Sequence, residues 1–418
     1  MSTVAASLGG ISDPQGLRRS LARAERRRKL RALALALPLL VFLLLTFLIP
    51  IAALLKRGVE NPEVANALPR TASALARWDR RGTPATEAFA ALTADLASLP
   101  DSSDAGALAR RLNTEVAGAR SLVMGTYRAL PLQDARTPDE IKAKLVALDE
   151  RWNEPTYWQA IAKNASRWTP DYLLASVDLR RSATGEVERM PVDQRVFGRI
   201  LLRTFEISAV VTMCCLLLGY PLAYWLSTLP ARQATVLMIL VLVPYWTSSL
   251  VRVAAWIVLL QSEGLVNRAL AGVGLIDHPL ALLFNRVGVV IAMTHILLPF
   301  MILPLYSVMK GVPSTYLRAA VSLGSTPLAA FFRVYVPQTY PGIGAGGLLV
   351  FILAIGYYVT PALLGGVDDQ MLSYYIAQYT NVNINWGMAC ALGTVLLAAT
   401  LVLYALYRRI VKAEVSLG

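Results

Sequence analysis

The stretches RAAVSLG (residues 318–324) and VYVP (residues 334–337) lie between two long apolar segments of the chain. The first contains a pair of small alanines, which lets a helix pack closely against another surface. Its last residue, Gly324, suits a tight turn, and Pro337 suits the end of a helix. We therefore predict two short helices around a turn. Because neither stretch carries a catalytic side chain, we expect this element to dock on a partner and to transmit motion to the apolar segments beside it.

The composition of the chain places it in a membrane. Of its 418 residues, 56% are hydrophobic and only 16% are charged, which is too apolar for a soluble protein of this length. The formal net charge of +13 raises the alternative of nucleic-acid binding. However, the Lys and Arg residues concentrate beside apolar runs, above all in residues 18–31, and no aromatic residues alternate with them. This distribution is typical of the positive-inside rule and predicts a cytoplasmic N-terminus.

Six apolar runs are each close to the 20 residues that a bilayer requires. The first is too long for a signal-peptide core and lacks a small-residue cleavage site, so we expect it to remain as an anchor. We therefore predict an all-α integral membrane protein with about six transmembrane helices. Their ranges are 32–55, 200–226, 234–260, 287–309, 343–364 and 388–407.

This topology divides the chain into segments. Residues 1–31 form a basic cytoplasmic segment, residues 32–56 the first transmembrane helix, and residues 197–418 a five-helix core with a cytoplasmic loop at 310–340. The turn near residue 230, this loop and the C-terminal tail all fall inside and all carry Lys or Arg, which agrees with a cytoplasmic C-terminus.

Residues 57–196, which we call the insertion domain, follow a single membrane span and are therefore expected in the periplasm. Apolar residues at helical spacing, such as Leu108 and Leu112, predict a small helical domain. Five aromatic residues near its end could line a binding surface, although packing is the more common role of such residues. They are Trp152, Tyr157, Trp158, Trp168 and Tyr172.

The 310–340 loop resembles the coupling loop of permease subunits of ATP-binding-cassette (ABC) importers. In that family the loop reads Glu-Ala-Ala, three residues, Gly, nine residues and Ile-x-Leu-Pro. Here the two alanines, Gly324 and the Val-x-Val-Pro run keep the same register, whereas Arg318 stands where the family usually has Glu. The resemblance implies that the loop inserts into a cleft of a partner ATPase and leaves the pairing of Arg318 open. The coupling residues that it implies are Arg318, Ala319, Ala320, Gly324, Ser325, Val334 and Pro337.

Further motifs are similar to the polyamine (spermidine/putrescine) branch of these permeases. They are GYPLAY (219–224), PYWTSSLVR (244–252), GLVN (264–267) and PALLGG (361–366). The resemblance begins near residue 197 and implies the type I ABC importer permease fold. Shorter members of the branch lack the insertion domain, so the resemblance does not explain it.

Several residues within the apolar runs are candidates for a substrate pathway. Arg252 is unfavourable in hydrocarbon, so it faces either a water-filled pathway or the outer interface, where Trp246 and Trp256 would form an aromatic belt. Glu206 could be a transient cation ligand, but an intrahelical pair with Arg203 explains it equally well. The predicted pathway residues are Glu206, Tyr245, Trp246, Arg252, Trp256, Tyr357 and Tyr358.

Three further residues bear on the substrate and on the course of the helices. Relatives in the polyamine branch often carry Glu where Tyr357 stands, and a tyrosine can still attract an ammonium group through its ring. A zwitterion or an amino acid derivative would also be compatible with it. We further expect Pro221 and Pro244 to interrupt their helices.

No metal site is predicted, because the two histidines, His278 and His295, lack ligand partners at suitable spacing and the three cysteines lie in apolar runs. The chain also lacks a nucleotide-binding Gly-rich loop, a nucleophile elbow and a zinc-protease helix. We therefore expect no enzyme activity and no cofactor in this chain, with ATP and Mg²⁺ held by a partner ATPase.

The sequence thus predicts a permease subunit of an ABC importer in the bacterial inner membrane, moving a polyamine such as putrescine or spermidine into the cytoplasm. Alternative substrates are another small amine, an amino acid derivative or an aminophosphonate. The expected partners are an ATPase dimer, a second and different permease subunit, a periplasmic binding protein and membrane lipid, but no nucleic acid. Two other classes remain possible at this point: a membrane receptor with a periplasmic sensor domain, and an ion-coupled carrier, which the scarcity of intramembrane carboxylates disfavours.

Overall fold

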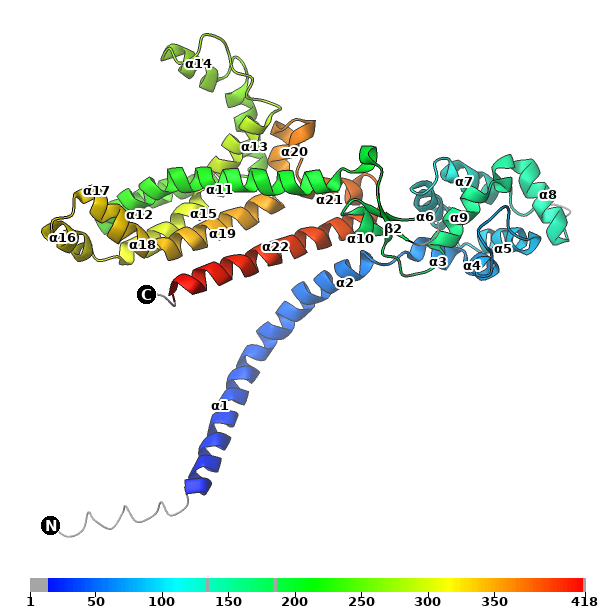
Figure 1. The fold of residues 1–418 in the computed structure, drawn as a ribbon, viewed down its shortest axis with the longest axis horizontal. Helices are drawn as coiled ribbons and strands as arrows, with labels where there is room; N and C mark the ends of the chain where they lie inside the picture. The colour runs from blue at the N-terminus through cyan, green and yellow to red at the C-terminus, as the bar shows by residue number, and fades with distance from the viewer. Residues whose placement is uncertain (1–13, 133–134, 183–185, 416–418) are drawn as a thin grey trace. The chain divides into compact units, whose positions relative to one another are not determined.

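The computed structural model describes residues 14–132, 135–182 and 186–415, and helices form most of it (Figure 1). The chain divides into two compact units, Met1–Lys56 and Arg57–Gly418, which are described separately. Five helices in the described residues are long and apolar enough to cross a membrane, or six when one bent helix pair is counted as a span. This number agrees with the expectation of about six.

The first unit is a helical run that contains the expected first span. It consists of α1 (Pro14–Leu43), a five-residue π-helix (Leu44–Leu48) and α2 (Ile49–Arg57). Pro50 is the second residue of α2, two positions after the end of the π-helix. Because proline has no N–H and its ring clashes with the carbonyl four residues earlier, a widened turn at this point accommodates it without ending the helix.

The insertion domain is helical except for one small hairpin, in which β1 (Leu179–Arg181) pairs antiparallel with β2 (Val187–Arg189). Proline at the first turn starts four of its helices, where the missing N–H has no intrahelical partner to lose. The helices are α3 (Pro62–Ala67), α4 (Pro69–Leu75), α5 (Thr86–Ala97), α6 (Ser102–Asn113), α7 (Ala119–Ala129), α8 (Pro138–Leu148), α9 (Pro155–Asn164) and α10 (Asp171–Ala175), with short 3-10 turns at Glu150–Asn153 and Val192–Gln194.

Aromatic packing forms the centre of the insertion domain. The Trp158 ring lies 4.5 Å from that of Phe89 and 5.4 Å from that of Trp152, and both tryptophans are fully buried. The indole N–H of Trp152 donates to the Thr126 hydroxyl at 2.9 Å, so its polar atom is satisfied. Of the five aromatic residues considered for a binding surface, only Trp168 is largely exposed. The packing interpretation therefore holds for Trp152, Tyr157 and Trp158, whereas Tyr172 is buried but also lines a pocket.

A buried guanidinium joins three helices of this domain. Arg111, on α6, is 6% exposed and donates to Asn61 at 3.2 Å and to Asn164 at 2.6 Å. It also forms an ion pair with Glu115 at 3.0 Å, and Lys163 pairs with the other oxygen of that carboxylate at 2.9 Å. A buried charge is tolerated when it is paired and hydrogen-bonded in this way.

The Glu115 pair makes the stability of the insertion domain depend on pH. Burial alone would raise the pKa of Glu115, but Arg111 and Lys163 hold it below its usual value of 4.5. Because the pKa of Glu115 is lower in the folded than in the unfolded protein, its carboxylate stabilises the fold at pH values above the unfolded-state pKa. That stabilisation is lost as the pH falls through the folded-state pKa. We expect Glu115→Gln to lower the free energy of unfolding by about 1–2 kcal/mol at pH 7. The difference should shrink below pH 4.5 when unfolding is followed by tryptophan fluorescence.

The control for this prediction is Glu154→Gln, because Glu154 is exposed and has no ion pair among the described residues. It should leave stability nearly unchanged at both pH values. An equal loss from Glu115→Gln at pH 7 and at pH 3.5 would show that the carboxylate charge does not stabilise the domain.

Residues 197–415 form the membrane helices and their connections. The helices are α11 (Phe197–Thr228), α12 (Ala231–Leu242), α13 (Ser249–Leu260), α14 (Leu265–Gly272), α15 (Arg286–Gly311), α16 (Ser314–Ser322), α17 (Pro327–Ala330), α18 (Val336–Gln338), α19 (Tyr340–Gly356), α20 (Val359–Leu364), α21 (Leu372–Asn381) and α22 (Trp386–Val415). Short 3-10 segments span Val243–Trp246 and Val367–Asp369, and a π segment spans Phe331–Tyr335.

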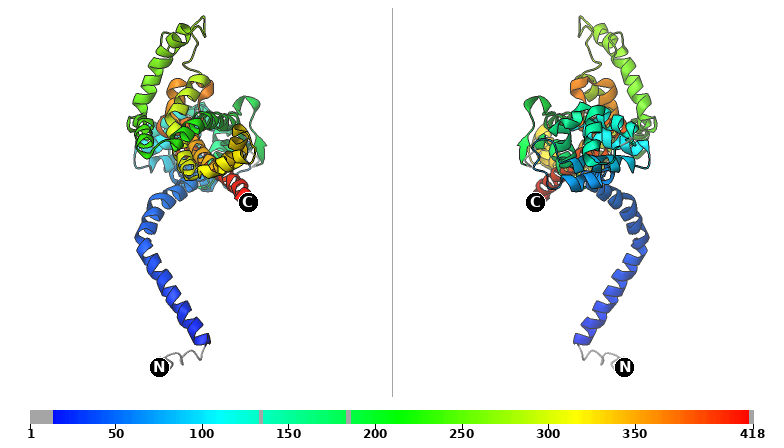
Figure 2. Two further views of the ribbon diagram at one scale, coloured as in Figure 1. Left: turned by 90° about the vertical axis from the view of Figure 1, so that its left-hand side faces the viewer. Right: turned by 90° about the vertical axis from the view of Figure 1, so that its right-hand side faces the viewer.

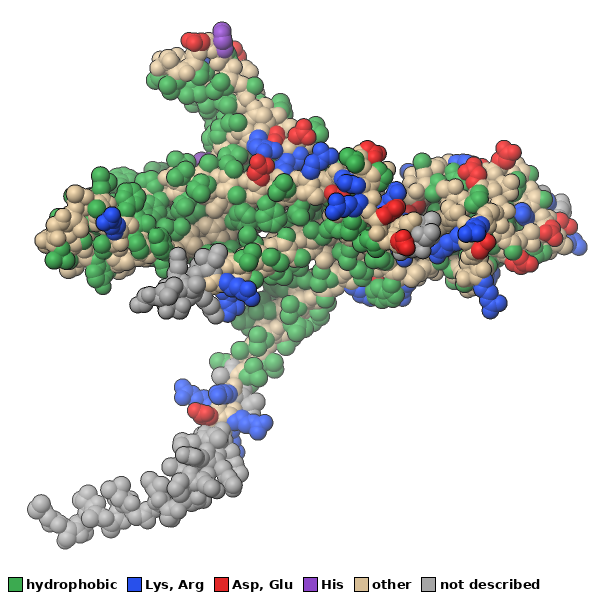
Figure 3. Space-filling model, viewed as in Figure 1, with side chains coloured by type: hydrophobic (Ala, Val, Ile, Leu, Met, Phe, Trp, Pro, Cys, Tyr) green, Lys and Arg blue, Asp and Glu red, His purple; other side chains and the backbone are tan. Residues whose placement is uncertain are grey.

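Helices α11, α15 and α19 pack side by side and form the centre of this region (Figure 1). Gly346 makes the close approach of α19 to α15 possible, because an added Cβ would lie 2.9 Å from the Met301 sulfur and 3.1 Å from its carbonyl oxygen. In contrast, α13 and α14 project from these helices in the views of Figures 1 and 2. Figure 3 shows mainly hydrophobic side chains over α11 and a concentration of charged ones where that helix begins.

Two expected spans differ from the structure. The 234–260 run is broken between α12 and α13, with Pro244 inside the 3-10 segment, as expected for an interrupting proline. The span that satisfies length and hydropathy is instead Ser249–Gly272. The 343–364 run begins earlier, at Tyr340, and α19 ends at Gly356.

The expected effect of one other proline was wrong. Pro221 lies inside the continuous helix α11, whose packing against α15 retains the helical path despite one missing hydrogen bond. Pro337 lies one residue before the end of the helical run Pro327–Gln338, and the chain then bends by 62° into α19, which agrees with the expected end of the second helix.

Candidate functional site

The 310–340 loop contains the two predicted short helices, α16 and α17, on either side of a tight turn. Gly324 adopts a φ of +96°, in the left-handed region that suits glycine. The amide of Ser325 donates to the carbonyl of Ala320 at 3.1 Å, which closes the C-terminal end of α16. The hydroxyl of Thr326 then accepts from the amide of Ala329 and caps α17. Local hydrogen bonds therefore define the turn.

The outer surface of this loop has no covering element among the described residues. No residue of α16 is buried, and Leu323 and Leu328 are 88% and 72% exposed. Arg318 is exposed and contacts only the hydroxyl of Ser314, at 3.3 Å, so no carboxylate in the described part of the chain neutralises it. Exposed apolar side chains beside an unpaired cation are suited to docking on another protein.

Aromatic rings connect the loop to α11. Phe331 and Tyr335 stack at 5.5 Å, and Tyr224 of α11 meets both rings edge-on, at 5.1 and 5.2 Å. The Tyr220 hydroxyl lies 3.0 Å from that of Thr339. These contacts give a movement of the loop a direct physical route into α11. These contacts were not predicted from the sequence, although the four-residue spacing of aromatics in both segments is a detectable signal.

Phe331→Ala is expected to weaken this connection. Removing the ring eliminates its contacts with Tyr224 and Tyr335 while leaving α16 and the Gly324 turn in place. If the loop passes motion to α11, a lost coupling energy of about 1 kcal/mol corresponds to roughly a fivefold change in the response. The measurement is ATP hydrolysis by the complex that the resemblance to ABC permeases implies, with and without substrate-loaded binding protein. Phe331→Leu, which keeps most of the apolar volume, should be milder, and an unchanged stimulation ratio for Phe331→Ala would contradict the route.

Three of the predicted pathway residues lie against α15. The indole N–H of Trp256 donates to Nδ1 of His295 at 3.2 Å, and the Tyr245 ring meets Phe300 edge-on at 5.3 Å. Arg252 lies one helical turn before Trp256, and its buried Nε has no hydrogen-bond partner among the described residues. The structure thus adds His295 and Phe300, which the sequence analysis did not assign to this group because they belong to another helix.

The remaining pathway candidates are dispersed. Trp246 is 73% exposed and has no ring contact with this group among the described residues. Tyr357 and Tyr358 occupy the break between α19 and α20, where Tyr357 is half-buried and Tyr358 is 44% exposed. An interrupted helix exposes backbone polar groups, and such breaks are tolerated in membranes where they line a cavity or pack against protein.

The expected Arg203–Glu206 pair is wrong. Glu206 instead pairs with Arg286 at 3.1 Å, and the same guanidinium contacts Asp369 at 3.2 Å. Arg203 turns to the backbone carbonyl of Asp368. The network joins the beginnings of α11 and α15 to the segment after α20, a long-range arrangement that helical spacing could not indicate.

Comparisons with known proteins cover this half of the chain. The family model described as binding-protein-dependent transport system inner membrane component matches residues 216–414. The spermidine/putrescine transport system permease protein PotB of Escherichia coli (strain K12) is 34% identical over 226 residues, which are 53% of this chain and 82% of that protein. The PotB protein of Haemophilus influenzae is 35% identical over 225 residues, covering 53% and 79% of the two chains.

Two more distant similarities complete the comparison. The putative 2-aminoethylphosphonate transport system permease protein PhnU of Salmonella paratyphi A is 26% identical over 233 residues, 54% of this chain and 81% of that protein. A solved structure of a bacterial alginate ABC transporter in complex with its periplasmic protein shares 16% identity, covers 51% of this chain and 77% of its own, and has a TM-score of 0.42. The family model begins after the insertion domain.

Proposed function

The chain belongs to the permease subunits of binding-protein-dependent ABC importers, and from this we infer that it forms part of the membrane pathway for a polyamine such as putrescine or spermidine. It is a multi-pass protein of the inner membrane and a transport subunit, not an enzyme, and ATP hydrolysis belongs to a separate ATPase. The substrate assignment rests on the resemblance to permeases named for spermidine and putrescine. The direction that we propose is from periplasm to cytoplasm.

The exposed 310–340 loop is the observation that most strongly supports a coupled mechanism. We propose that it inserts into a cleft of an ATPase dimer through the following residues: Arg318, Ala319, Ala320, Gly324, Ser325, Val334 and Pro337. Closure of the ATPases around ATP and Mg²⁺, which they alone bind, would pull on the loop. The rings of Phe331 and Tyr335 would pass that motion to α11. Transport follows if the two states of the pathway bind the substrate differently.

The other partners belong to the same proposal. A second and different permease subunit would complete the pathway, and a periplasmic binding protein would deliver the substrate. Both chain termini would then lie in the cytoplasm. The exposed apolar side chains of α13 and α14, including Leu250 and Leu265, offer a surface for lipid or for the second permease.

The pathway itself would use the aromatic group on α13 and α15. Tyr245 and Trp256 present rings that attract an ammonium group, and Tyr357 adds another where α19 ends. Glu206 is held by Arg286, so a cation would meet it as a member of an ion-pair network near the start of α11. Trp246 and Tyr358 would lie at the margin of the pathway. Arg252 would place a positive charge beside it.

Binding measurements on the partner binding protein test the substrate assignment. The panel comprises putrescine, spermidine, 4-aminobutyrate and 2-aminoethylphosphonate, the last because of the similarity to PhnU. We expect micromolar or tighter binding of a polyamine and at least 100-fold weaker binding of the zwitterions. Preference for the aminophosphonate or for an amino acid derivative would replace the polyamine with that class while leaving the permease assignment intact.

A further inference from the structure

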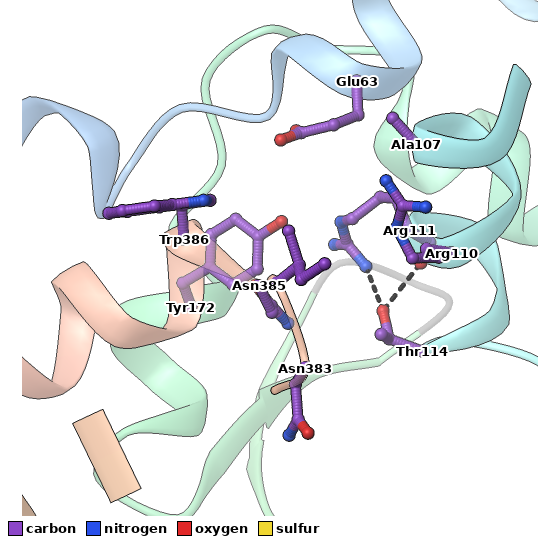
Figure 4. Close-up of a pocket in the computed structure, with 10 residues that line it drawn as sticks. Glu63, Ala107, Arg110, Arg111, Thr114, Tyr172, Asn383, Asn385 and Trp386 are labelled. Atoms are coloured by element: carbon purple, nitrogen blue, oxygen red, sulfur yellow. Dashed lines mark hydrogen bonds between the residues drawn. The ribbon is translucent and has the colours of Figure 1, made fainter. Parts of the chain in front are cut away.

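A small pocket lies between the insertion domain and the segment that leads into α22 (Figure 4). Its volume is about 190 Å³, below the 300–1,000 Å³ typical of sites for drug-sized ligands, so only a compact molecule fits. Helices α3, α6 and α10 supply one wall, and residues 383–386 supply the other. The side chains that matter are Glu63, Arg110, Arg111, Tyr172 and Trp386.

Tight packing holds the pocket in place. The Tyr172 ring lies against Gly387, where an added Cβ would come 2.4 Å from a ring carbon. The guanidinium of Arg111 lies 5.0 Å from the centre of the same ring and is itself held by Asn164. Asp178, which follows α10, accepts hydrogen bonds from the first amides of α11. The pocket is thus a preformed feature of the joint between the insertion domain and the membrane helices.

Two acceptors in the pocket have no hydrogen-bond partner in the described residues. Tyr172 is 6% exposed, and its hydroxyl points into the pocket, between Glu63 and Arg111, without any hydrogen bond (Figure 4). One oxygen of the Glu63 carboxylate pairs with Arg57, but the other, Oε2, is shielded from solvent and has no partner. Buried polar atoms are rarely left unsatisfied, so Glu63 Oε2 points to a missing hydrogen-bond donor, whereas the Tyr172 hydroxyl is open to the pocket.

The same wall of the pocket carries an available cation on α6. Arg110 is half-buried and forms no ion pair with the described residues, whereas Arg111 pairs with Glu115, which it shares with Lys163. A guanidinium without an ion-pair partner is suited to a carboxylate or phosphonate group. The wall that the insertion domain supplies therefore combines a carboxylate, a phenol and an available guanidinium.

We propose that this pocket binds a compact zwitterion, with its ammonium group near the Glu63 carboxylate and the Tyr172 hydroxyl and its anionic group on Arg110. The half-exposed ring of Trp386 closes over the ligand. Burial raises the pKa of Tyr172 to about 12, so the phenol stays neutral and adds no charge. A dication fits less well, because its second ammonium would face the guanidinium of Arg110.

The site is separate from the transport pathway. A ligand bound there would affect the contact between the insertion domain and the membrane helices. A ligand that contacts both walls binds only when they are together, so it stabilises the attachment of the insertion domain to α22. Its binding can be measured on the purified permease without ATPase or binding protein. Failure of this proposal would therefore leave the proposed transport function unaffected.

The test uses three probes with the same four-carbon chain: 4-aminobutyrate, putrescine and butyrate. Titration calorimetry on the full chain in detergent is expected to show binding of 4-aminobutyrate at least tenfold tighter than that of either other probe. Glycine and 2-aminoethylphosphonate then distinguish a short amino acid from an aminophosphonate. Tighter binding of putrescine, or binding of none of these five molecules, would overturn the proposal.

Matched variants locate the binding. Arg110→Gln and Glu63→Gln should each weaken binding of the best zwitterion at least tenfold, and Tyr172→Phe, which keeps the ring and its packing, should weaken it severalfold. Arg120→Gln alters an exposed arginine of the same domain and should have no effect. Thermal unfolding identifies any variant that fails to fold, and Tyr172→Phe is the least disruptive of the three. Unchanged affinity in folded Arg110→Gln and Tyr172→Phe proteins would contradict the site.

Discussion

Deletion of residues 319–324 is expected to abolish the stimulation of ATP hydrolysis by substrate-loaded binding protein while leaving membrane insertion intact. The deletion removes most of the second half of α16 and the Gly324 turn, whose surface is exposed and has no covering element in the described part of the chain. It removes no residue of α15 or α19, so these helices keep their packing against each other and against α11. The ATPase would then close without moving the permease.

The measurement compares stimulated with basal ATP hydrolysis in reconstituted complexes. Arg318→Ala serves as the matched control, because it changes the exposed side chain at the start of the same element and keeps the turn. A single exposed charge contributes about 1 kcal/mol or less, so we expect Arg318→Ala to retain most of the stimulation. Normal stimulation in the deletion variant would show that the loop does not couple the two subunits.

The largest effect on stability is expected from Arg111→Ala. This substitution removes the cation at the centre of a buried network and leaves the Asn61 side-chain oxygen without its donor, whereas the Asn164 oxygen keeps only the Asn61 amide at 3.0 Å. Breaking a buried ion pair by deleting one member typically lowers stability by about 3–5 kcal/mol. The insertion domain should therefore unfold at a markedly lower temperature, observed as a shift in the fluorescence of the buried Trp152 and Trp158.

Arg120→Ala is the control for this stability prediction, since Arg120 lies exposed on the neighbouring helix α7. Its unfolding temperature should match that of the unmodified protein. If Arg111→Ala shifts the transition no more than Arg120→Ala does, then the network does not hold the insertion domain together.

Features that depend on local sequence could be predicted. The turn at Gly324 follows from a glycine after a helical segment, and the helices beside it were expected at the observed place. The burial of Trp152 and Trp158 also follows from ordinary packing behaviour. Hydrophobic length alone indicated about six spans, because the bilayer sets a minimum length for each.

Features that depend on distant residues could not be predicted. Glu206 and Arg286 are 80 positions apart, so no helical spacing connects them, and the closer Arg203 was the natural expectation. The continuity of α11 through Pro221 has the same origin, because packing against α15 retains the helical path and the sequence near the proline does not contain that information. The break at Pro244, in contrast, was expected from the proline itself.

Uptake of radiolabelled putrescine by proteoliposomes tests the central claim most directly. The vesicles would contain this permease with its second permease and ATPase, with binding protein supplied on the outer side. The account predicts ATP-dependent accumulation of putrescine that competes with spermidine and that is absent when residues 319–324 are deleted. Accumulation without ATP, or undiminished accumulation by the deletion variant, would contradict it.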